Sequence, residues 1–410
     1  MNEILKGHVK SKSTNKALLL FRNTWRRRGR RDDCSIDSYT VLFVLKACMI
    51  RSCEEEIKHV HALVLKLGFH CIVFVQTMLV NSYSGARLVK DAHKVFDEMP
   101  ERNVVCWTGL ISAYVDNGRP DRALKLFREM QMENVEADSV TVTVALCACA
   151  DLGALEMGEW IHSYVRCKRG FKMDLQLKNA VINMYAKCGD IGAARRMFDE
   201  LGRSRNVTTW TSMIVGHALH GQAEEALRLF EEMRSRKHGV MVPNDVTYIG
   251  VLMACSHAGL VEEGRRYLES MSKECGLSPR MAHYGCMVDL LCRRGQLNDA
   301  YQFVVDMPIR ANAVVLRTLL SACSLQGNIA LGAKVRRQLL ETEPDHASDN
   351  VIMSNAYAAA GMWDAKEMVR AQMKHARKVP GCSSIELKSS VHKFISGDSR
   401  RQALRNSARS

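Results

Sequence analysis

The chain of 410 residues lacks the features that mark several large classes of protein. Its longest apolar segment, near residues 39–50, is interrupted by Lys46 and falls short of the roughly 18 residues that a membrane-spanning helix needs. It contains only 7 prolines and 26 glycines, which excludes a collagen-like or low-complexity chain. We therefore expect a globular protein that has no membrane partner.

Metal-binding and catalytic motifs are missing as well. The 15 cysteines include no C-x-x-C pair, and no segment matches H-E-x-x-H, G-x-x-x-x-G-K-[ST] or G-x-S-x-G. Cys147 and Cys149 are two residues apart, so they would face different sides of a helix. Because free cysteine packs as a small hydrophobic residue, we expect core thiols in a reducing compartment. The sequence predicts no enzyme activity, no cofactor and no metal site.

What the chain does contain is internal repetition. The segment WTGLI at Trp107 returns as WTSMI at Trp210, and each is followed by an A-L-x-L-F segment. Two further helix pairs are predicted at 313–346 and 347–378. Before them, units of three kinds follow one another in strict rotation, with lengths from 31 to 38 residues: 2–37, 38–72, 73–103, 104–138, 139–174, 175–206, 207–244, 245–280 and 281–312.

Within a unit, the apolar residues recur with the spacing of a helix. Gly118 and Pro120 interrupt two such runs, as expected for a turn between helices. A single helix pair cannot bury its own apolar faces, but stacked pairs can. The predicted fold is therefore all-α, an α-solenoid superhelix of helix–turn–helix repeats. The positions i, i+3, i+4 and i+7 of one run are Trp107, Leu110, Ile111 and Tyr114.

The rotation of three unit types resembles the PLS subclass of plant pentatricopeptide repeat proteins. The segments PGCSSIEL (380–387) and VHKFISGD (391–398) are similar to the E and E-plus extensions of organellar RNA-editing factors. Since Met1 falls inside the first repeat, the resemblance also implies that the natural start, with an organellar transit peptide, lies upstream. Its implied organisation is nine repeats over 2–312, an E motif over 313–378, an E-plus-like segment over 379–398 and a basic tail over 399–410.

The resemblance implies a sequence-specific protein that binds single-stranded organellar RNA and recognises sites of C-to-U RNA editing. A DYW-type deaminase would act in trans, because the H-x-E and C-x-x-C motifs of that zinc enzyme do not occur in this sequence. Multiple organellar RNA editing factor proteins are further implied partners. The implied location is the mitochondrion, with the chloroplast as the alternative. Two other functions stay open: an RNA processing, splicing or stability factor, and a tetratricopeptide-like scaffold that binds peptides.

Ten polar residues are the candidates for reading the RNA bases. In five of the six standard and short units, the fifth position of the repeat is Thr or Asn and the last residue is Asp or Asn; in the first unit, since Met1 falls inside the repeat, that position is Asn2. Proteins that read one base per helical repeat use two or three side chains for it, and in the pentatricopeptide family these are the fifth and last residues. The pairs are Asn2/Asp37, Thr77/Asn103, Thr108/Asp138, Asn179/Asn206 and Thr211/Asn244.

Carried over from the family, the five pairs imply U, A, G, a pyrimidine and A, in that order. The implied target is 5′-U-N-A-G-N-Y-A-N-N-3′, with the edited cytidine a few nucleotides beyond its 3′ end. The last residue also precedes a helix, where Asp or Asn is a good N-cap, and this structural role does not exclude a second one. The remaining repeats depart from the code and are expected to be loosely read: Leu42/Ile72, Thr143/Asp174, Ile249/Arg280 and Gly285/Asn312.

Two other features have structural interpretations that we favour. Trp107, Trp210, His61 and His162 recur at fixed positions among aliphatic residues, so we expect them in the core. The 58 Lys and Arg exceed the 44 Asp and Glu, giving a net charge of +14, which favours binding to nucleic acid without selecting a sequence. The run RRRGRR at 26–31 is expected to be a solvated loop.

Overall fold

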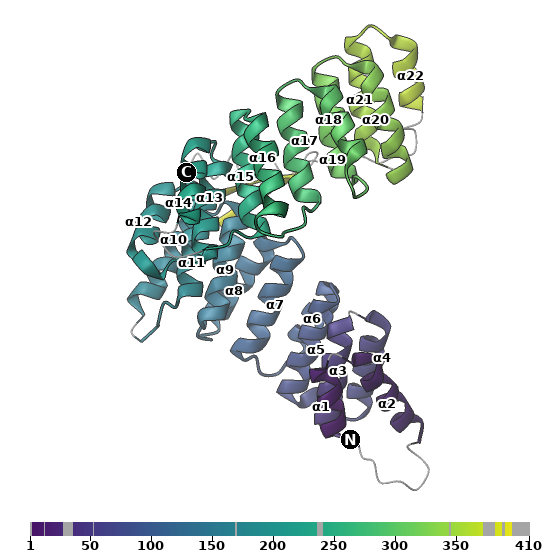
Figure 1. Cartoon of the computed structure of the whole chain (residues 1–410). Coiled ribbons are helices and arrows are strands. Elements are labelled where there is room, and N and C mark those ends of the chain that lie inside the picture. The colour runs from purple at the N-terminus through teal and green to yellow at the C-terminus, as the bar shows by residue number, and fades with distance from the viewer. Residues whose placement is uncertain are drawn as a thin grey trace, which may run out of the picture. The chain divides into compact units, whose positions relative to one another are not determined.

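A computed structural model describes residues 2–11, 13–27, 36–51, 53–168, 170–235, 241–343, 346–371, 382–387 and 390–395. Successive helix pairs build the chain, which confirms the predicted α-solenoid (Figure 1). The predicted basic tail at 399–410 and residues 28–31 of the arginine run lie outside the described residues. The chain divides into two compact units, Met1–Val181 and Ile182–Ser410, which we describe in turn.

In the first unit, the first helix of each pair packs against the first helix of the next. Thus α1 contacts α3, α3 contacts α5, α5 contacts α7 and α7 contacts α9. The helices are α1 (Asn2–Lys10), α2 (Thr14–Arg27), α3 (Ser38–Arg51), α4 (Glu54–Lys66), η1 (Phe69–Cys71), α5 (Val73–Gly85), α6 (Val89–Asp97), α7 (Val104–Asp116), α8 (Pro120–Met132), α9 (Ser139–Leu152) and α10 (Leu155–Cys167).

The second unit repeats this arrangement. Helix α13 contacts α15, α15 contacts α17, α17 contacts α19 and α19 contacts α21. The boundary between the units falls within α11 (Leu175–Cys188). The other helices are α12 (Ile191–Glu200), η2 (Gly202–Ser204), α13 (Val207–Leu219), α14 (Ala223–Arg234), α15 (Asp245–Ala258), α16 (Val261–Lys273), α17 (Met281–Arg293), α18 (Leu297–Asp306), α19 (Ala313–Leu325), α20 (Ile329–Thr342), α21 (Ala347–Ala359) and α22 (Trp363–Ala371).

The pair α7 and α8 illustrates why these residues form helices with a turn between them. Gly118 adopts φ 66°, a left-handed conformation that costs glycine little, and Pro120 begins α8. Trp107 is fully buried, and its ring meets that of Phe96 edge-on with the centroids 4.6 Å apart. Trp210 of α13 is buried in the same way against Phe198 of α12, at 4.9 Å. The prediction that both tryptophans lie in the core is confirmed.

The two histidines that were expected in the core differ from each other. His162 is buried, as predicted. His61 is half-buried, and its Nδ1 lies 3.0 Å from the hydroxyl of Tyr83, against whose ring it packs edge-on. Burial lowers the pKa of His61 and raises the pKa of Tyr83 to about 12, so both side chains are neutral at pH 7. His61 therefore has a structural contact at the edge of the core.

The C-terminal segment adds an element that the all-α prediction did not include. Strands β1 (Cys382–Leu387) and β2 (Ser390–Ile395) pair in antiparallel register within the segment predicted as E-plus-like. The cysteines whose side chains the structure describes, from Cys48 to Cys323, are free thiols. Across the same residues, no helix is both long and apolar enough to cross a bilayer.

Candidate nucleic-acid interface

The last residue of every predicted reading pair caps the helix that follows it. In each case a backbone N–H in the first turn of that helix donates to the side-chain oxygen of the cap, which confirms the predicted N-cap role. The donors and caps are Thr40 and Asp37 (2.7 Å), Cys106 and Asn103 (3.0 Å), Thr141 and Asp138 (2.8 Å), Thr209 and Asn206 (3.0 Å), and Thr247 and Asn244 (2.9 Å).

A threonine of the following helix joins the fifth residue to the last residue in the fourth repeat. The hydroxyl oxygens of Thr108 and Thr141 lie 2.6 Å apart, and the Thr141 hydroxyl donates to Oδ1 of Asp138 (2.7 Å). Thr141 is the third residue of the next repeat and has no exposed surface. The predicted pair is thus brought together through a residue that the sequence analysis did not single out.

The same connection recurs in the seventh repeat. The hydroxyl oxygens of Thr211 and Thr247 lie 2.7 Å apart, and the Thr247 hydroxyl donates to Oδ1 of Asn244 (2.8 Å). Thr247 is again the third residue of the following repeat and is fully buried. Two repeats that differ in their last residue therefore share one geometry.

In the first repeat the pair also makes direct contact. The amide of Asn2 donates to both carboxylate oxygens of Asp37, at 3.1 and 3.0 Å. The Thr40 hydroxyl lies 2.7 Å from Oδ1 of Asp37 and 2.8 Å from Oδ1 of Asn2. Partial burial acts to raise the pKa of Asp37, but the hydrogen bonds from Thr40 and Asn2 outweigh it and hold the pKa below its ordinary value. Asp37 is therefore an ionised acceptor at neutral pH.

The Thr77/Asn103 pair is not joined in this way. In the third repeat the third residue of the next helix is Cys106, and the Thr77 hydroxyl donates to the carbonyl oxygen of Val73 (2.8 Å). Among the described residues, no hydrogen bond joins Thr77 to Asn103. Asn179 and Asn206 belong to different units, and within its own unit Asn206 accepts a hydrogen bond from the Thr209 hydroxyl (2.9 Å).

Capping also decides which atom of the last residue points away from the helix. In Asn244 both the backbone N–H and the hydroxyl of Thr247 donate to Oδ1, so the amide NH₂ is directed outward. In Asp138 the same two donors from Thr141 occupy Oδ1, and the outward atom is the second carboxylate oxygen. An Asp at this position therefore presents an acceptor, whereas an Asn presents a donor.

Exposed apolar side chains at the second position of several repeats are a further feature that sequence reasoning missed. In the first unit Tyr39 and Phe74 stack on each other, with ring centroids 5.6 Å apart and planes inclined by 28°. An apolar residue two positions after the last residue of a repeat was the available signal, because that side of the helix is otherwise polar. The exposed members are Tyr39, Phe74, Val105 and Val140 in the first unit, and Val246 and Val314 in the second.

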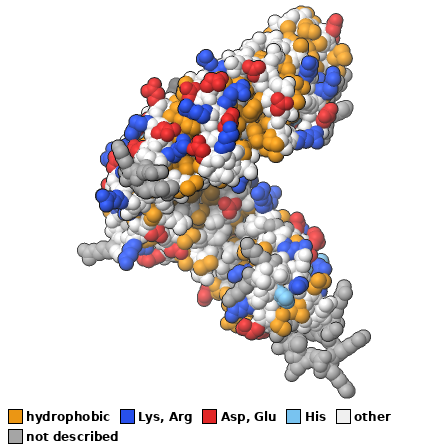
Figure 2. All heavy atoms as spheres, in the orientation of Figure 1, with side chains coloured by type: hydrophobic (Ala, Val, Ile, Leu, Met, Phe, Trp, Pro, Cys, Tyr) orange, Lys and Arg blue, Asp and Glu red, His pale blue; other side chains and the backbone are white. Residues whose placement is uncertain are grey.

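On the face of the second unit that Figure 2 shows, the Lys and Arg side chains do not form a separate positively charged patch. Figure 2 shows Lys and Arg side chains interspersed with Asp and Glu on that face of the second unit. Many of these charges pair along one helix, as Arg228 does with Glu225 (2.6 Å) and Glu232 (3.0 Å). Within the described part of the chain, no group of three or more His, Cys, Asp or Glu is arranged to hold a metal ion.

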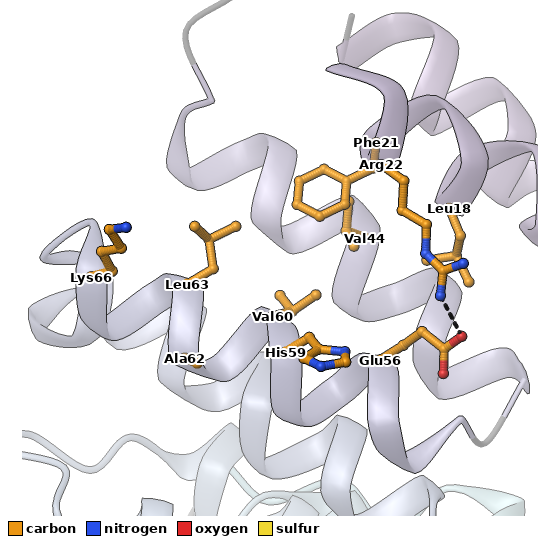
Figure 3. Close-up of a pocket in the computed structure, with 10 residues that line it drawn as sticks. All are labelled: Leu18, Phe21, Arg22, Val44, Glu56, His59, Val60, Ala62, Leu63 and Lys66. Carbon is orange, nitrogen blue, oxygen red and sulfur yellow. Dashed lines mark hydrogen bonds and ion pairs between the residues drawn. The ribbon is translucent and has the colours of Figure 1, made fainter. Parts of the chain in front are cut away.

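An apolar groove of about 370 Å³ lies in the first unit, lined by residues of α2, α3 and α4. Figure 3 shows Phe21 of α2, Val44 of α3 and Leu63 of α4 turned toward one another along it, with the Arg22–Glu56 ion pair (3.0 Å) at one end. None of the ten predicted site residues lines this groove. The polar pairs therefore remain the candidate interface.

In the helix pair after the ninth repeat, an ion pair takes the place of the hydrogen bonds through threonine. Arg317, at the fifth position, donates through Nε to Asp349 (2.8 Å), the third residue of the next pair, whose side chain is almost fully buried. Removing the guanidinium would leave a buried carboxylate without its main partner. An Arg317→Met substitution should therefore lower the free energy of unfolding by about 3 kcal/mol, measured by urea denaturation.

The matched control is Lys273→Met, which removes one member of the exposed Lys273–Glu269 pair. Pairs of that kind contribute at most about 1 kcal/mol. Equal losses for the two variants would contradict the structural role assigned to Arg317.

Comparison with known families supports the repeat architecture. Residues 102–151 and 205–257 match the PPR repeat family, and residues 77–104, 178–205, 246–275 and 282–310 match the PPR repeat. Residues 327–386 match the E motif, which begins later than the predicted range 313–378 and extends into β1.

Relatives from Arabidopsis thaliana align over most of the chain. Pentatricopeptide repeat-containing protein At1g59720, chloroplastic/mitochondrial, is 40% identical over 91% of this chain and 60% of its own length. Pentatricopeptide repeat-containing protein At5g56310 is 39% identical over 88% of this chain and 74% of its own length. The chain thus spans about three fifths of the length of some of these relatives.

Among solved structures, the chain is similar to the pentatricopeptide repeat protein PPR10 in complex with an 18-nucleotide psaJ RNA element. The TM-score is 0.61 at 13% identity, covering 92% of this chain and 61% of the other. A crystal structure of PPR10 from maize gives a TM-score of 0.50 at 19% identity, covering 93% and 59% of the two chains. At sequence identities this low, the similarity shows that the folds are alike and nothing more.

Proposed function

Since the chain belongs to the pentatricopeptide repeat family, we propose that it binds single-stranded RNA and reads one base in each of five repeats. The observation that carries this proposal is the set of polar groups at the repeat junctions, in which the fifth and last residues of the first, fourth and seventh repeats meet through a buried threonine. Bases differ in the donors and acceptors on their edges, and paired side chains can distinguish them. The similarity in fold to PPR10, which was solved in complex with an 18-nucleotide RNA, supports the same assignment.

The proposed reading pairs are those predicted from the sequence, with the target 5′-U-N-A-G-N-Y-A-N-N-3′. An outward carboxylate oxygen at Asp37 or Asp138 suits the N–H edges of U and G. An outward amide NH₂ at Asn244 suits the acceptor N1 of A. The exposed apolar residues at the second positions offer surfaces against which base faces could pack.

We propose further that the chain acts in an organelle as a site-recognition factor for C-to-U editing, with a DYW-type deaminase acting in trans. The match to the E motif and the resemblance of residues 379–398 to an E-plus segment support this role. Relatives named chloroplastic or mitochondrial support an organellar location, for which we retain the mitochondrion as first choice. A processing, splicing or stability factor is the alternative on the same RNA-binding surface.

Binding of the purified protein to the RNA 5′-UUAGUCAUU-3′ tests the first part of the proposal. We expect submicromolar affinity that falls steeply between 50 and 200 mM salt, because phosphates neutralised by Lys and Arg release counterions. A scrambled RNA of the same composition is the control for sequence reading. Equal affinity for both RNAs, or a flat response to salt, would contradict the proposal and favour a peptide-binding scaffold.

Loss of the protein in the plant tests the second part. Transcript sequencing should then show one or a few organellar cytidines that are no longer converted to uridine, each a few nucleotides 3′ of a match to the target. Unchanged editing together with altered transcript ends or splicing would replace the editing role by the processing alternative.

A further inference from the structure

We propose that the third residue of each following repeat is a positioning residue that fixes how the reading pair faces the base. This inference rests on the proposed RNA-reading function. It concerns Thr40, Thr141, Thr209 and Thr247, which have no exposed surface and each donate through the hydroxyl to the cap side chain.

The pattern of residue types along the chain supports the inference independently of the hydrogen bonds. Threonine occupies the third position after four of the five predicted reading pairs, and Cys106 occupies it after the remaining pair. After the four repeats that depart from the code, the residues at this position are Val75, Leu177, His283 and Val315.

Packing alone does not require the threonine. Val75, Leu177 and Val315 are as fully buried at the third position as Thr141 is. An apolar side chain can therefore fill this buried position of the helix as well as threonine does. Among the nine repeats, a threonine at this position follows only pairs whose fifth and last residues are both polar, although the polar pair Thr143/Asp174 is followed by Leu177. The role of the hydroxyl therefore concerns those polar residues.

The hydrogen bonds show what the hydroxyl does. A threonine hydroxyl carries one hydrogen, and in the fourth repeat Thr141 directs it to the Asp138 carboxylate, the strongest acceptor nearby. Thr108, 2.6 Å away, must then donate its own hydrogen toward Thr141 or toward the carbonyl oxygen of Val104. In both cases Thr108 offers only acceptor lone pairs to the base.

Without the Thr141 hydroxyl, both members of the pair would lose this constraint. Asp138 would keep one donor, the backbone N–H of residue 141, and could rotate about its last side-chain bond. Thr108 could turn its hydrogen outward. The site would then accept more than one base.

The test compares Thr141→Val, which preserves shape and removes the hydroxyl, with Thr141→Ser, which keeps it. For each protein the affinity for 5′-UUAGUCAUU-3′ is divided by that for the same RNA carrying A at the fourth nucleotide. This ratio does not depend on the fraction of folded protein in a preparation. We expect Thr141→Val to lower the preference for G about five- to tenfold, the value of one hydrogen bond, and Thr141→Ser to change it less than about twofold.

Two further variants make the test specific. Thr143→Val is the matched control, because the Thr143 hydroxyl donates only to the carbonyl oxygen of Ser139 in the same helix, and it should leave the ratio unchanged. Thr247→Val should weaken the preference for A at the seventh nucleotide, and it provides a second measurement if Thr141→Val fails to fold.

The outcomes separate this inference from the function on which it rests. A Thr141→Val protein that binds both RNAs more weakly but with the wild-type ratio would show a purely structural role and overturn the inference. A wild-type protein without preference at the fourth nucleotide would overturn the proposed function as well. A gain of preference for A at the third nucleotide in Cys106→Thr would support the inference from the opposite direction.

Discussion

An Asp138→Asn variant is expected to prefer adenine to guanine at the fourth nucleotide of the RNA. The backbone N–H and hydroxyl of Thr141 hold Oδ1 of the present Asp138. An Asn at this position would keep its own Oδ1 in the cap, because both capping groups are donors. Its NH₂ would then replace the outward carboxylate oxygen, turning an acceptor into a donor at one point in space.

The size of the change follows from the base edges. The carboxylate accepts from N1–H and N2–H₂ of guanine, whereas an amide NH₂ donates to N1 of adenine. Discrimination by comparable side-chain contacts in duplex DNA amounts to about 1–3 kcal/mol, or roughly 5- to 150-fold in relative affinity. The measurement is a competition among four RNAs that differ only at the fourth nucleotide.

Capping by itself predicts a different result, which makes the experiment decisive. Asp and Asn are N-caps of about equal quality, so the variant should be about as stable as the parent protein. Asp174→Asn is the matched control. Asp174 accepts from the backbone N–H of Leu177 (2.8 Å), and Leu177 stands where the following repeat would otherwise have a threonine at its third position. An unchanged order of preference in a folded Asp138→Asn protein would contradict the assignment of Thr108 and Asp138 as a reading pair.

A Trp210→Ala variant is expected to lose about 3–5 kcal/mol of the free energy of unfolding, which is the usual cost of emptying a large aromatic site in a core. Trp210 is fully buried, and its ring meets that of Phe198 edge-on. The guanidinium carbon of Arg205 lies 5.6 Å from the centre of the ring and adds a cation–π contact. Urea denaturation followed by circular dichroism measures the loss.

The exposed Trp160 provides the control for this substitution. Its side chain stacks on Tyr164 at the surface of α10 with 44% of its area exposed, so Trp160→Ala should cost no more than about 1 kcal/mol. RNA affinity should fall in Trp210→Ala only as far as the protein unfolds. A stable Trp210→Ala protein that has lost RNA affinity would show instead that the ring stacks on a base.

The sequence by itself determined the repeating helix pairs and the caps between them. Both depend on residues close together in the chain. The helical period around Trp107 places one apolar face on α7, Gly118 and Pro120 set the turn into α8, and Asp138 caps the helix that begins one residue later. Such local signals were sufficient to predict the α-solenoid and the N-cap role of the last residues.

Only the tertiary structure decided which residues meet across successive repeats. Thr108 and Thr141 are 33 residues apart, and Thr211 and Thr247 are 36 apart. Their contact depends on how the first helices of neighbouring pairs pack, which no local pattern specifies. The same holds for the ion pair of Arg317 with Asp349 and for the pairing of β1 with β2.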